Sequence, residues 1–201
     1  IIPEEKLVFV PDGVSDEVAS CITLKGITAE YLLHRAYPLK KGDKVLYHAA
    51  AGALGQILCP WANALGAEVI GTVGSKAKEE IAKKNGCHHV INYSEKDFVK
   101  EVEKTFGKNS LDVVYDGVGS KTFKGSIETL KIRGMMVAFG NASGYVETLD
   151  IKKDINAKGL FFTRPSIAHY TVKREELVES AKKVFDAVLT KKFKIEISKR
   201  Y

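Results

Sequence analysis

The chain has 201 residues, of which 45% are hydrophobic and 28% charged, and its 31 Lys and Arg exceed its 25 Asp and Glu by a formal net charge of +6. This balance is typical of an ordinary globular protein with one large or two small domains. No apolar run approaches the roughly 20 residues that span a bilayer, and no signal peptide opens the chain. The basic residues are scattered over segments such as 76–84 and 96–104, which is typical of solvated helix faces rather than of a nucleic-acid-binding patch.

The three cysteines, Cys21, Cys59 and Cys87, show no C-x-x-C spacing and are odd in number. A zinc knuckle or a disulfide framework is therefore not expected. Reduced structural thiols are the expectation, and they agree with a cytoplasmic protein that makes no contact with a membrane.

The N-terminal part of the chain predicts a turn followed by a helix. Residues 11–13 (Pro-Asp-Gly) are a turn signal, and Ser15 can cap a helix over residues 16–34. Gly26 and Thr28 interrupt the pattern, so the sequence is compatible with one helix or with two abutting helices.

From residue 44 onward, predicted strands and helices alternate. Strands are expected over residues 44–47, 68–73, 89–92, 111–115, 134–139, 160–163 and 195–197, and helices over 56–65, 76–85, 95–106, 122–130 and 174–189. This alternation predicts an α/β fold, namely a doubly wound parallel sheet of the Rossmann type with helices on both faces.

The first strand leads directly into a turn of small residues, 48–55 (HAAAGALG). In doubly wound folds a dinucleotide pyrophosphate lies at this turn, because small residues let it reach the helix amides and the helix dipole favours the anion. Gly55 would let the helix pack closely on the strand. The match to G-x-G-x-x-G is imperfect, since Ala50 replaces the first glycine, and a tight turn without a ligand is the alternative.

The end of the second strand indicates which dinucleotide is bound. Binders of NAD usually carry Asp or Glu about 20 residues past the glycines, where it holds the ribose 2′-hydroxyl. Here Val73 occupies that position, Gly74 and Ser75 leave room, and two lysines follow at Lys76 and Lys78. A 2′-phosphate needs both space and cations, so NADP(H) is favoured over NAD(H). The alternative is that these lysines are ordinary surface residues.

Short segments typical of one known protein family are spread over nearly the whole chain. They are residues 24–28, 48–55, 61–62, 65–67, 71–74, 90–93, 114–119, 139–144 and 163–166. With these segments the chain resembles the zeta-crystallin-like quinone oxidoreductases of the medium-chain dehydrogenase/reductase superfamily. The resemblance implies NADPH as cofactor, hydride transfer to a quinone or another conjugated carbonyl, and no catalytic zinc. It also implies a homodimer whose paired sheet edge lies near residues 134–139 and Leu160.

The resemblance assigns cofactor contacts by position. The nicotinamide and its carboxamide would be approached by Thr28, Phe162 and Thr163, and the pyrophosphate by Gly52, Ala53 and Leu54. The adenosine 2′-phosphate would be surrounded by Gly74, Ser75, Lys78 and Tyr93, and the groove at the strand ends would be lined by Val118, Phe139, Gly140 and Asn141. The alternatives are that Tyr93 is simply a strand-end aromatic residue and that Phe139 belongs to the core.

Two departures from the family pattern affect what the chain can do. The family commonly has Gly-Gly where this chain has Gly52-Ala53, and the extra methyl is tolerated if φ is below zero there. Family members also carry an N-terminal catalytic domain of GroES-like fold, which is largely absent here together with half of the substrate pocket. We therefore expect residues 1–13 to be a remnant of the linker from that domain and residues 14–192 to be the NADP(H)-binding Rossmann domain. Residues 193–201 are expected to begin the segment that returns to the catalytic domain.

No residue stands out as an acid, base or nucleophile, so no catalytic residue is assigned. His48 is a candidate by residue type, although a helix-cap or packing histidine is favoured, and Asp116 is expected to cap a loop. Two other functions stay open. One is an enoyl or alkenal reductase on the same scaffold, and the other is a non-catalytic binding protein, either RNA-binding or structural as in crystallins.

Overall fold

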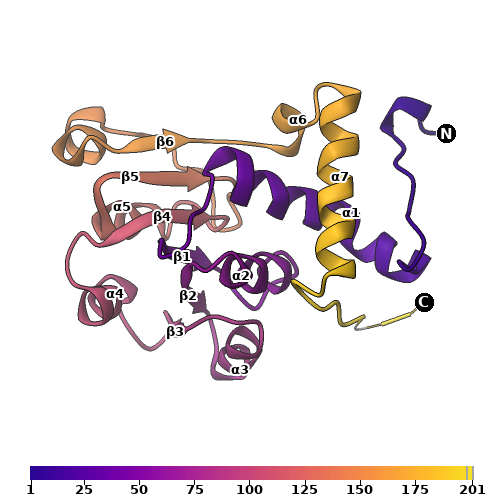
Figure 1. Ribbon diagram of the computed structural model, residues 1–201. Helices are drawn as coiled ribbons and strands as arrows, with labels where there is room; N and C mark the ends of the chain where they lie inside the picture. Colours follow the sequence, from indigo (N-terminus) through magenta and orange to yellow (C-terminus); the bar gives the residue numbers. More distant parts are fainter. Residues whose placement is uncertain (198, 201) are drawn as a thin grey trace.

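A computed structural model describes residues 1–197, 199 and 200, and its centre is a six-stranded parallel sheet (Figure 1). The strand order is β3-β2-β1-β4-β5-β6. The strands are β1 (Lys44–His48), β2 (Glu68–Val73), β3 (His89–Asn92), β4 (Leu111–Asp116), β5 (Leu130–Ala138) and β6 (Phe161–Thr163). This is the order of the doubly wound dinucleotide-binding fold, so the predicted fold class is confirmed.

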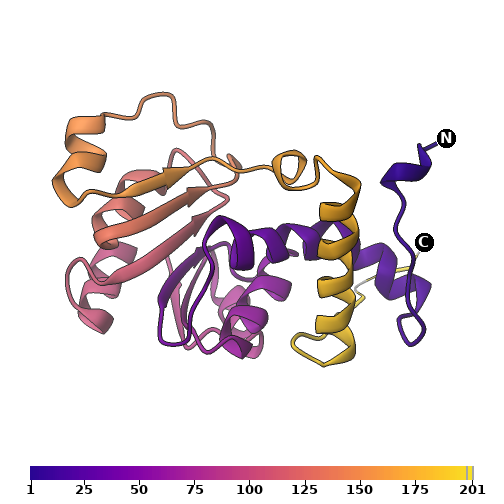
Figure 2. The same ribbon diagram turned by 45° about the horizontal axis from the view of Figure 1, so that its top comes forward.

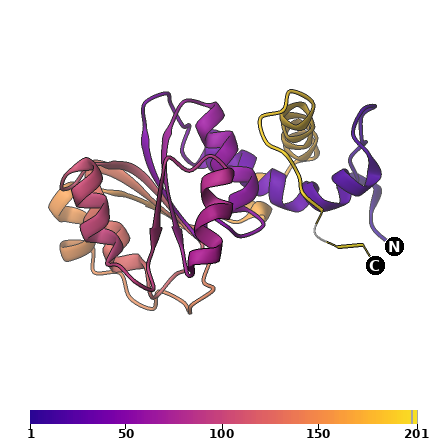
Figure 3. The ribbon, with the colours of Figure 1, turned by 90° about the horizontal axis from the view of Figure 1, so that it is seen from below.

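Helices cover both faces of the sheet, and for this reason the central strands are continuous apolar runs. The α-helices are α1 (Asp16–Tyr31), α2 (Gly55–Ala64), α3 (Lys76–Lys84), α4 (Phe98–Phe106), α5 (Phe123–Thr129), α6 (Ile167–Tyr170) and α7 (Arg174–Leu189). One apolar cluster joins the sheet to α1, α2, α3 and α7, and a second joins it to α4 and α5. Figure 3 shows α2 and α3 on one side of the strands and α4 and α5 on the other.

The N-terminal helix is continuous through the two positions at which a break was possible. Ser15 caps α1 as predicted, since its side chain accepts a hydrogen bond from the Val18 amide at 3.3 Å. Gly26 faces Val184 of α7 with no room for a β-carbon, so this glycine allows α1 and α7 to cross closely. The Thr28 hydroxyl donates to the Leu24 carbonyl at 2.8 Å without ending the helix, and α1 runs on into a π-helical turn, η2 (Leu32–Ala36).

Three other segments differ from the sequence-based expectation. The helix expected from residue 95 begins at Phe98, because the Asp97 carboxylate caps it by accepting from the amide of Val99 at 2.9 Å. Strand β5 begins at Leu130, four residues early. Residues 195–197, expected as a strand, are not part of the sheet.

The long connection between β5 and β6 contains a π-helical turn, η3 (Ile151–Ile155), and a 3-10 turn, η4 (Asn156–Lys158). Figure 2 shows it as the orange excursion that leads into the edge strand β6. Lys158 anchors it, because its Nζ donates to the carbonyls of Ile127, Glu128 and Leu130 at 2.8–3.0 Å, where α5 ends. A lysine at a helix C-terminus satisfies free carbonyls and complements the helix dipole.

The two ends of the described chain meet the helical layer formed by α1 and α7. Arg174 of α7 donates to the Glu5 carbonyl at 2.8 Å, and Glu5 lies in a short 3-10 turn, η1 (Glu4–Lys6). Arg200 forms an ion pair with Glu17 at 2.6 Å. Among residues 1–197, 199 and 200, no helix has the length and apolar character that crossing a membrane would require.

Candidate functional site

The carboxyl ends of β1 and β4 open a crevice, because these strands are neighbours whose following helices, α2 and α5, lie on opposite faces of the sheet. In open α/β sheets, ligands bind at this reversal of strand order. Most predicted site residues lie at this edge: Gly52, Ala53 and Leu54 follow β1, Gly74, Ser75 and Lys78 follow β2, Tyr93 follows β3, Val118 follows β4, Phe139, Gly140 and Asn141 follow β5, and Thr163 ends β6.

The turn after β1 is shaped by one residue in an unusual conformation. Ala49 has a left-handed backbone, with φ at 62°, and the Ala50 amide donates to the Thr72 carbonyl of β2 at 2.9 Å. Ala53 is outside the left-handed region, so its methyl is tolerated as expected. At Gly55 a β-carbon would overlap the Ala50 carbonyl, so only glycine lets α2 start this close to the turn. Gly52 and Ala53 are exposed, which leaves their backbone open to a ligand.

The ends of β2 and β3 bring together two residues assigned to the same role. A β-carbon on Gly74 would lie 2.6 Å from the Tyr93 hydroxyl oxygen, so the phenol ring lies over the glycine. The Tyr93 amide donates to Val73 at 3.0 Å and fixes this register. Ser75 begins α3 without a side-chain capping bond, and Lys78 is exposed in its first turn.

A pocket of about 520 Å³ lies between the loops that follow β1, β3, β4 and β5. Its lining residues are Ala49, Tyr93, Lys96, Asp97, Phe98, Val118, Lys121, Thr122, Ala142 and Ser143. Of the predicted site residues, the pocket contains Tyr93 and Val118. The pocket combines aromatic and aliphatic surface with two lysines, a combination that suits a flat heterocycle carrying phosphate.

Sequence reasoning missed the residues at the start of α4. Lys96, Asp97 and Phe98 were interpreted as part of a helix beginning at residue 95 and were therefore not considered as loop residues. The signal was present, because Asp followed by a helical pattern marks an N-cap, and the loop before that cap lies at the carboxyl edge of the sheet.

Asp116 organises the loop after β4. Its carboxylate is fully buried and accepts from the amides of Val118 and Gly119 at 2.8 and 2.9 Å, and from the Thr122 hydroxyl at 2.8 Å. The expectation that Asp116 caps a loop is confirmed. The Ser126 hydroxyl of α5 lies 3.3 Å away as a further donor, so the carboxylate ties the loop after β4 to α5 and holds the pocket wall in place.

The ends of β4 and β5 pack tightly against each other. A β-carbon on Gly140 would lie 2.5 Å from the Gly117 carbonyl oxygen, so glycine is required for this approach. The Phe139 ring lies over Gly117 and stacks on Tyr47 with ring centroids 6.2 Å apart. Phe139 therefore packs against the core on the α2 face as well as bordering the crevice.

The side chains of Phe162 and Thr163, the two predicted site residues on β6, point to opposite faces of the sheet. Phe162 pairs with Met136 and makes an edge-to-face contact with Phe123 at 6.0 Å on the α5 face. Thr163 pairs with Val137 on the other face, since successive strand residues alternate. Their side chains therefore cannot approach one ligand group from the same side. Thr28 lies on α1 and not at a strand end.

His48 is a buried residue beneath the pocket. Its side chain is 1% exposed and is hydrogen-bonded through both ring nitrogens, so it is a packing histidine rather than an accessible base. Burial lowers the pKa of His48 because desolvation disfavours the imidazolium, and the nearby Asp116 opposes this only in part.

The described residues contain no group of three or more His, Cys, Asp or Glu side chains that could hold a metal ion. Cys59 and Cys87 are buried free thiols, and Cys21 is an exposed one. The neighbouring Cys87 thiol and burial raise the pKa of Cys59 well above its ordinary value, which makes it a poor nucleophile.

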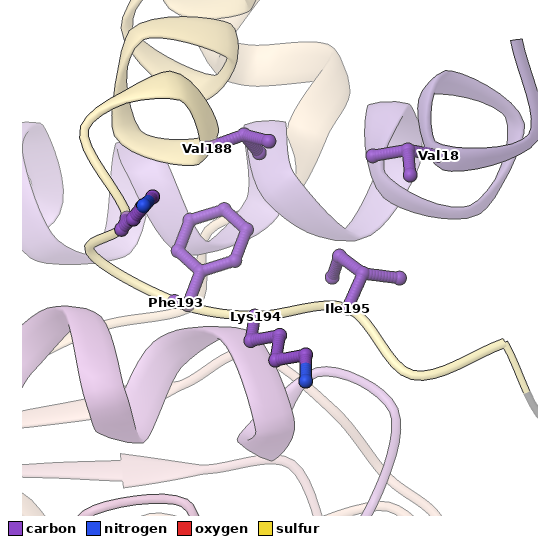
Figure 4. Close-up of a pocket in the computed structure, with 6 residues that line it drawn as sticks. Val18, Val188, Phe193, Lys194 and Ile195 are labelled. Carbon is purple, nitrogen blue, oxygen red and sulfur yellow. The ribbon is translucent and has the colours of Figure 1, made fainter. Parts of the chain in front are cut away.

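A second hollow, of about 420 Å³, lies between α1, α7 and the segment that follows α7. Figure 4 shows Val18, Val188, Phe193 and Ile195 around it, with Lys194 pointing away from the apolar side chains. None of its lining residues belongs to the loops at the carboxyl edge, so it is separate from the candidate site.

The fold and this edge define a dinucleotide-binding domain of the doubly wound class. Residues 53–189 match the family described as zinc-binding dehydrogenase, and the chain belongs to that family. The name describes the family as a whole and assigns no zinc ligand to this chain.

Curated relatives with high sequence identity are named as two kinds of reductase. The chain is 47% identical over 191 residues to a 2-haloacrylate reductase of Burkholderia sp, covering 94% of this chain and 57% of the relative. It is 42% identical to a quinone oxidoreductase of Salmonella typhimurium, covering 98% of this chain and 60% of the relative. The predicted resemblance to quinone oxidoreductases is confirmed, and the chain spans about 60% of the length of the curated relatives it matches.

Solved structures agree with the sequence matches. The crystal structure of Escherichia coli quinone oxidoreductase complexed with NADPH aligns with a TM-score of 0.89 at 42% identity, over 94% of this chain and 58% of that one. The crystal structure of a 2-haloacrylate reductase aligns with a TM-score of 0.91 at 45% identity, over 96% of this chain and 61% of that one.

Proposed function

We propose that this chain is the NADPH-binding domain of a reductase that transfers hydride to a quinone. The observation that carries the proposal is the end of β2, where Gly74 lies under the Tyr93 phenol and no carboxylate is present to hold a ribose diol. Ser75 at the N-cap of α3 adds a hydroxyl that makes no capping bond, and Lys78 in the first turn adds a cation. This combination favours a 2′-phosphate over a 2′-hydroxyl. The relative whose structure is complexed with NADPH supports the same cofactor.

The residues present fit the cofactor along the whole edge. The pyrophosphate would lie at Gly52, Ala53 and Leu54, where exposed small residues precede the amides of α2. The adenosine would occupy the pocket between Tyr93 and Val118. Gly140 lets the loops that follow β4 and β5 approach each other closely, because a β-carbon there would meet the Gly117 backbone.

NADPH supplies the hydride, and the chain contributes binding and orientation. Phe139 and Asn141 after β5, and Thr163 at the end of β6, would border the nicotinamide, and Thr28 would approach it from α1. The Phe162 side chain points to the other face, so we assign it a contact through its backbone only. No side chain in this domain is assigned a proton-transfer role.

The domain division follows from the same proposal. Residues 1–13 and 193–201 would connect to a catalytic domain, and residues 14–192 would form the cofactor-binding unit. The quinone would then bind between this unit and the rest of a chain of the relatives' length. We expect residues 1–201 alone to bind NADPH weakly and to turn over little substrate.

A second candidate is reduction of a conjugated carbon–carbon double bond. The 47% identity to a 2-haloacrylate reductase favours it, because the acceptor in that enzyme's name is an unsaturated acid. The full-length protein assayed with a quinone and with a haloacrylate separates the two candidates. Faster turnover of the haloacrylate would replace the quinone assignment.

We propose a cytoplasmic homodimer that pairs through β6. This strand is the sheet edge, and its Phe161 side chain is 58% exposed. An exposed apolar edge strand is an open template for another strand. Analytical ultracentrifugation tests the proposal, and a monomer at micromolar concentration would remove it.

The cofactor proposal is tested by titrating the chain with NADPH and NADH and following the fluorescence of the reduced nicotinamide. NADPH is expected to bind more tightly, and Lys78→Ala is expected to remove the preference. Lys104→Ala is the matched control, since it removes an exposed lysine from α4. Equal binding of the two cofactors would overturn the 2′-phosphate assignment.

A further inference from the structure

His48 links two walls of the pocket through buried hydrogen bonds. It is the last residue of β1, and its Nδ1 lies 2.9 Å from the Thr72 hydroxyl of β2. Its Nε2 lies 2.9 Å from the Ser126 hydroxyl of α5, and its ring meets Phe98 of α4 edge-on at 5.0 Å. One side chain therefore contacts β2, α4 and α5.

The direction of these hydrogen bonds follows from the single hydroxyl proton of Ser126. That proton is donated within the loop and helix, to the Thr122 carbonyl at 2.8 Å or to Asp116 at 3.3 Å. Toward His48 the Ser126 oxygen can then only accept, so Nε2 carries the ring proton. In the neutral ring Nδ1 is left as the acceptor for the Thr72 hydroxyl. The chain of donors runs from Thr72 through His48 to Ser126.

This chain of hydrogen bonds ends at the residues that shape the pocket. Ala49 follows His48 directly, has the left-handed backbone and lines the pocket. At the other end, Asp116 accepts from Ser126 and Thr122 and holds the amides of Val118 and Gly119. Phe98 and Thr122 are themselves lining residues. Through these contacts and hydrogen bonds, His48 connects the turn after β1, the loop after β4 and the start of α4.

We propose that His48 is a positioning residue, which fixes the turn after β1 against the loop after β4 so that the pocket is preorganised for the adenosine end of the cofactor. The inference rests on the proposed function, since it takes NADPH as the ligand. A preorganised pocket binds more tightly because less ordering is left for the ligand to impose. His48 touches no reacting group.

Three substitutions distinguish the contributions of the two hydrogen bonds of His48. His48→Gln keeps an N–H donor near the Nε2 position and can retain the bond to Ser126. His48→Phe keeps the ring and removes both bonds. Ser126→Ala removes the hydrogen bond between Ser126 and His48 while the histidine itself is retained. Thr129→Val is the matched control, because Thr129 is an equally buried residue of α5 whose hydroxyl donates to the Ser126 carbonyl and not to His48 or Asp116.

The probes are NADPH and its two halves, 2′,5′-ADP and reduced nicotinamide mononucleotide, each titrated against the folded chain. In His48→Phe and Ser126→Ala the dissociation constants of NADPH and 2′,5′-ADP are expected to rise roughly tenfold. The constant for the mononucleotide should not change. His48→Gln should restore most of the affinity, and Thr129→Val should lower Tm without affecting binding.

A general loss of structure would weaken both halves of the cofactor equally and would overturn the positioning role. Unchanged affinity for 2′,5′-ADP in folded Ser126→Ala would overturn it as well. If the wild-type chain binds neither NADPH nor 2′,5′-ADP, the proposed function fails before the role of His48 is reached, so the two failures are distinguishable.

Discussion

The Tyr93 hydroxyl lies over Gly74 closely enough that a β-carbon at position 74 would be 2.6 Å from its oxygen. The contact joins the ends of two neighbouring strands, since Val73 of β2 pairs with Asn92 of β3. Tyr93 is 46% exposed, so its phenol is available to a ligand while it rests on the glycine. The absence of a side chain at Gly74 therefore makes room for the Tyr93 ring at the end of β2.

Gly74→Ala is expected to displace the Tyr93 ring and to raise the dissociation constant of NADPH by roughly tenfold. The ring end is flexible and exposed, so the free energy of unfolding should change by less than about 0.5 kcal/mol. Fluorescence titration with NADPH and NADH measures the effect, and NADPH should lose more affinity than NADH because only NADPH carries the 2′-phosphate. Undiminished NADPH binding by Gly74→Ala would show that the position of Tyr93 does not matter to the cofactor.

Much of this edge could be predicted from the sequence, because it depends on local patterns. Strands β2 and β3 were predicted with the correct bounds, since buried parallel strands are short apolar runs between turn residues. The requirement for Gly55 also followed from local geometry. The π-helical turn η3 was not predicted, because its Asp154 is held by Lys124, thirty positions away in the chain.

The contacts that could not be predicted are set by register and by distant partners. Alternation along β6 places Phe162 and Thr163 on opposite faces, but only the pairing with β5 shows which face each one takes. The hydrogen bonds of His48 to Thr72 and Ser126 span 24 and 78 residues. A histidine at a strand end carries no local signal for such partners.

Lys158→Met is expected to lower the free energy of unfolding by about 1–2 kcal/mol, because three carbonyls near the end of α5 lose their donor. The methionine keeps the length of the side chain, so the loss reports the hydrogen bonds and the charge. Urea unfolding followed by circular dichroism measures it. Lys152→Met, an exposed lysine of the same connection, should change the free energy by less than about 0.5 kcal/mol.

Stability is expected to fall as the pH is lowered below about 6.5. Burial lowers the pKa of His48 and of His34 in the folded chain, so the unfolded chain binds more protons in the range below the ordinary value of 6.5. The free energy of unfolding then decreases by about 1.4 kcal/mol per pH unit for each histidine that is protonated only when unfolded. The contribution is fully present above pH 6.5 and is lost as the pH falls toward the folded pKa.

Urea unfolding of the wild type and of His48→Gln at several pH values between 8 and 5 tests this expectation. The variant should be less stable at pH 8 and should show a shallower decline toward pH 5, because one of the two histidines no longer titrates. Parallel declines would mean that His48 is not responsible for the acid sensitivity.

Glu30 is expected to be the most sensitive charged position in the helical layer. Its carboxylate is fully buried on α1 and meets Arg35 at 3.1 Å, Lys183 at 3.3 Å and the Ser180 hydroxyl at 2.5 Å. Arg35 continues the contact to α6, donating to the Tyr170 carbonyl at 2.8 Å and lying over the Tyr170 ring. The group therefore holds α1, α6 and α7 together.

Removing the carboxylate takes the acceptor from the buried Ser180 hydroxyl and a partner from Arg35 and Lys183, which are partly exposed, so the loss is about 1–3 kcal/mol. Glu30→Ala should accordingly lower the free energy of unfolding by that amount, measured by urea denaturation. Glu179→Ala is the control, because Glu179 pairs with the same Lys183 on the exposed side of α7, where ion pairs contribute little to stability. Equal losses in the two variants would show that burial of Glu30 adds nothing to the strength of the pair. A larger loss at Glu30 would identify the buried carboxylate as the anchor between α1 and the helices that follow β6.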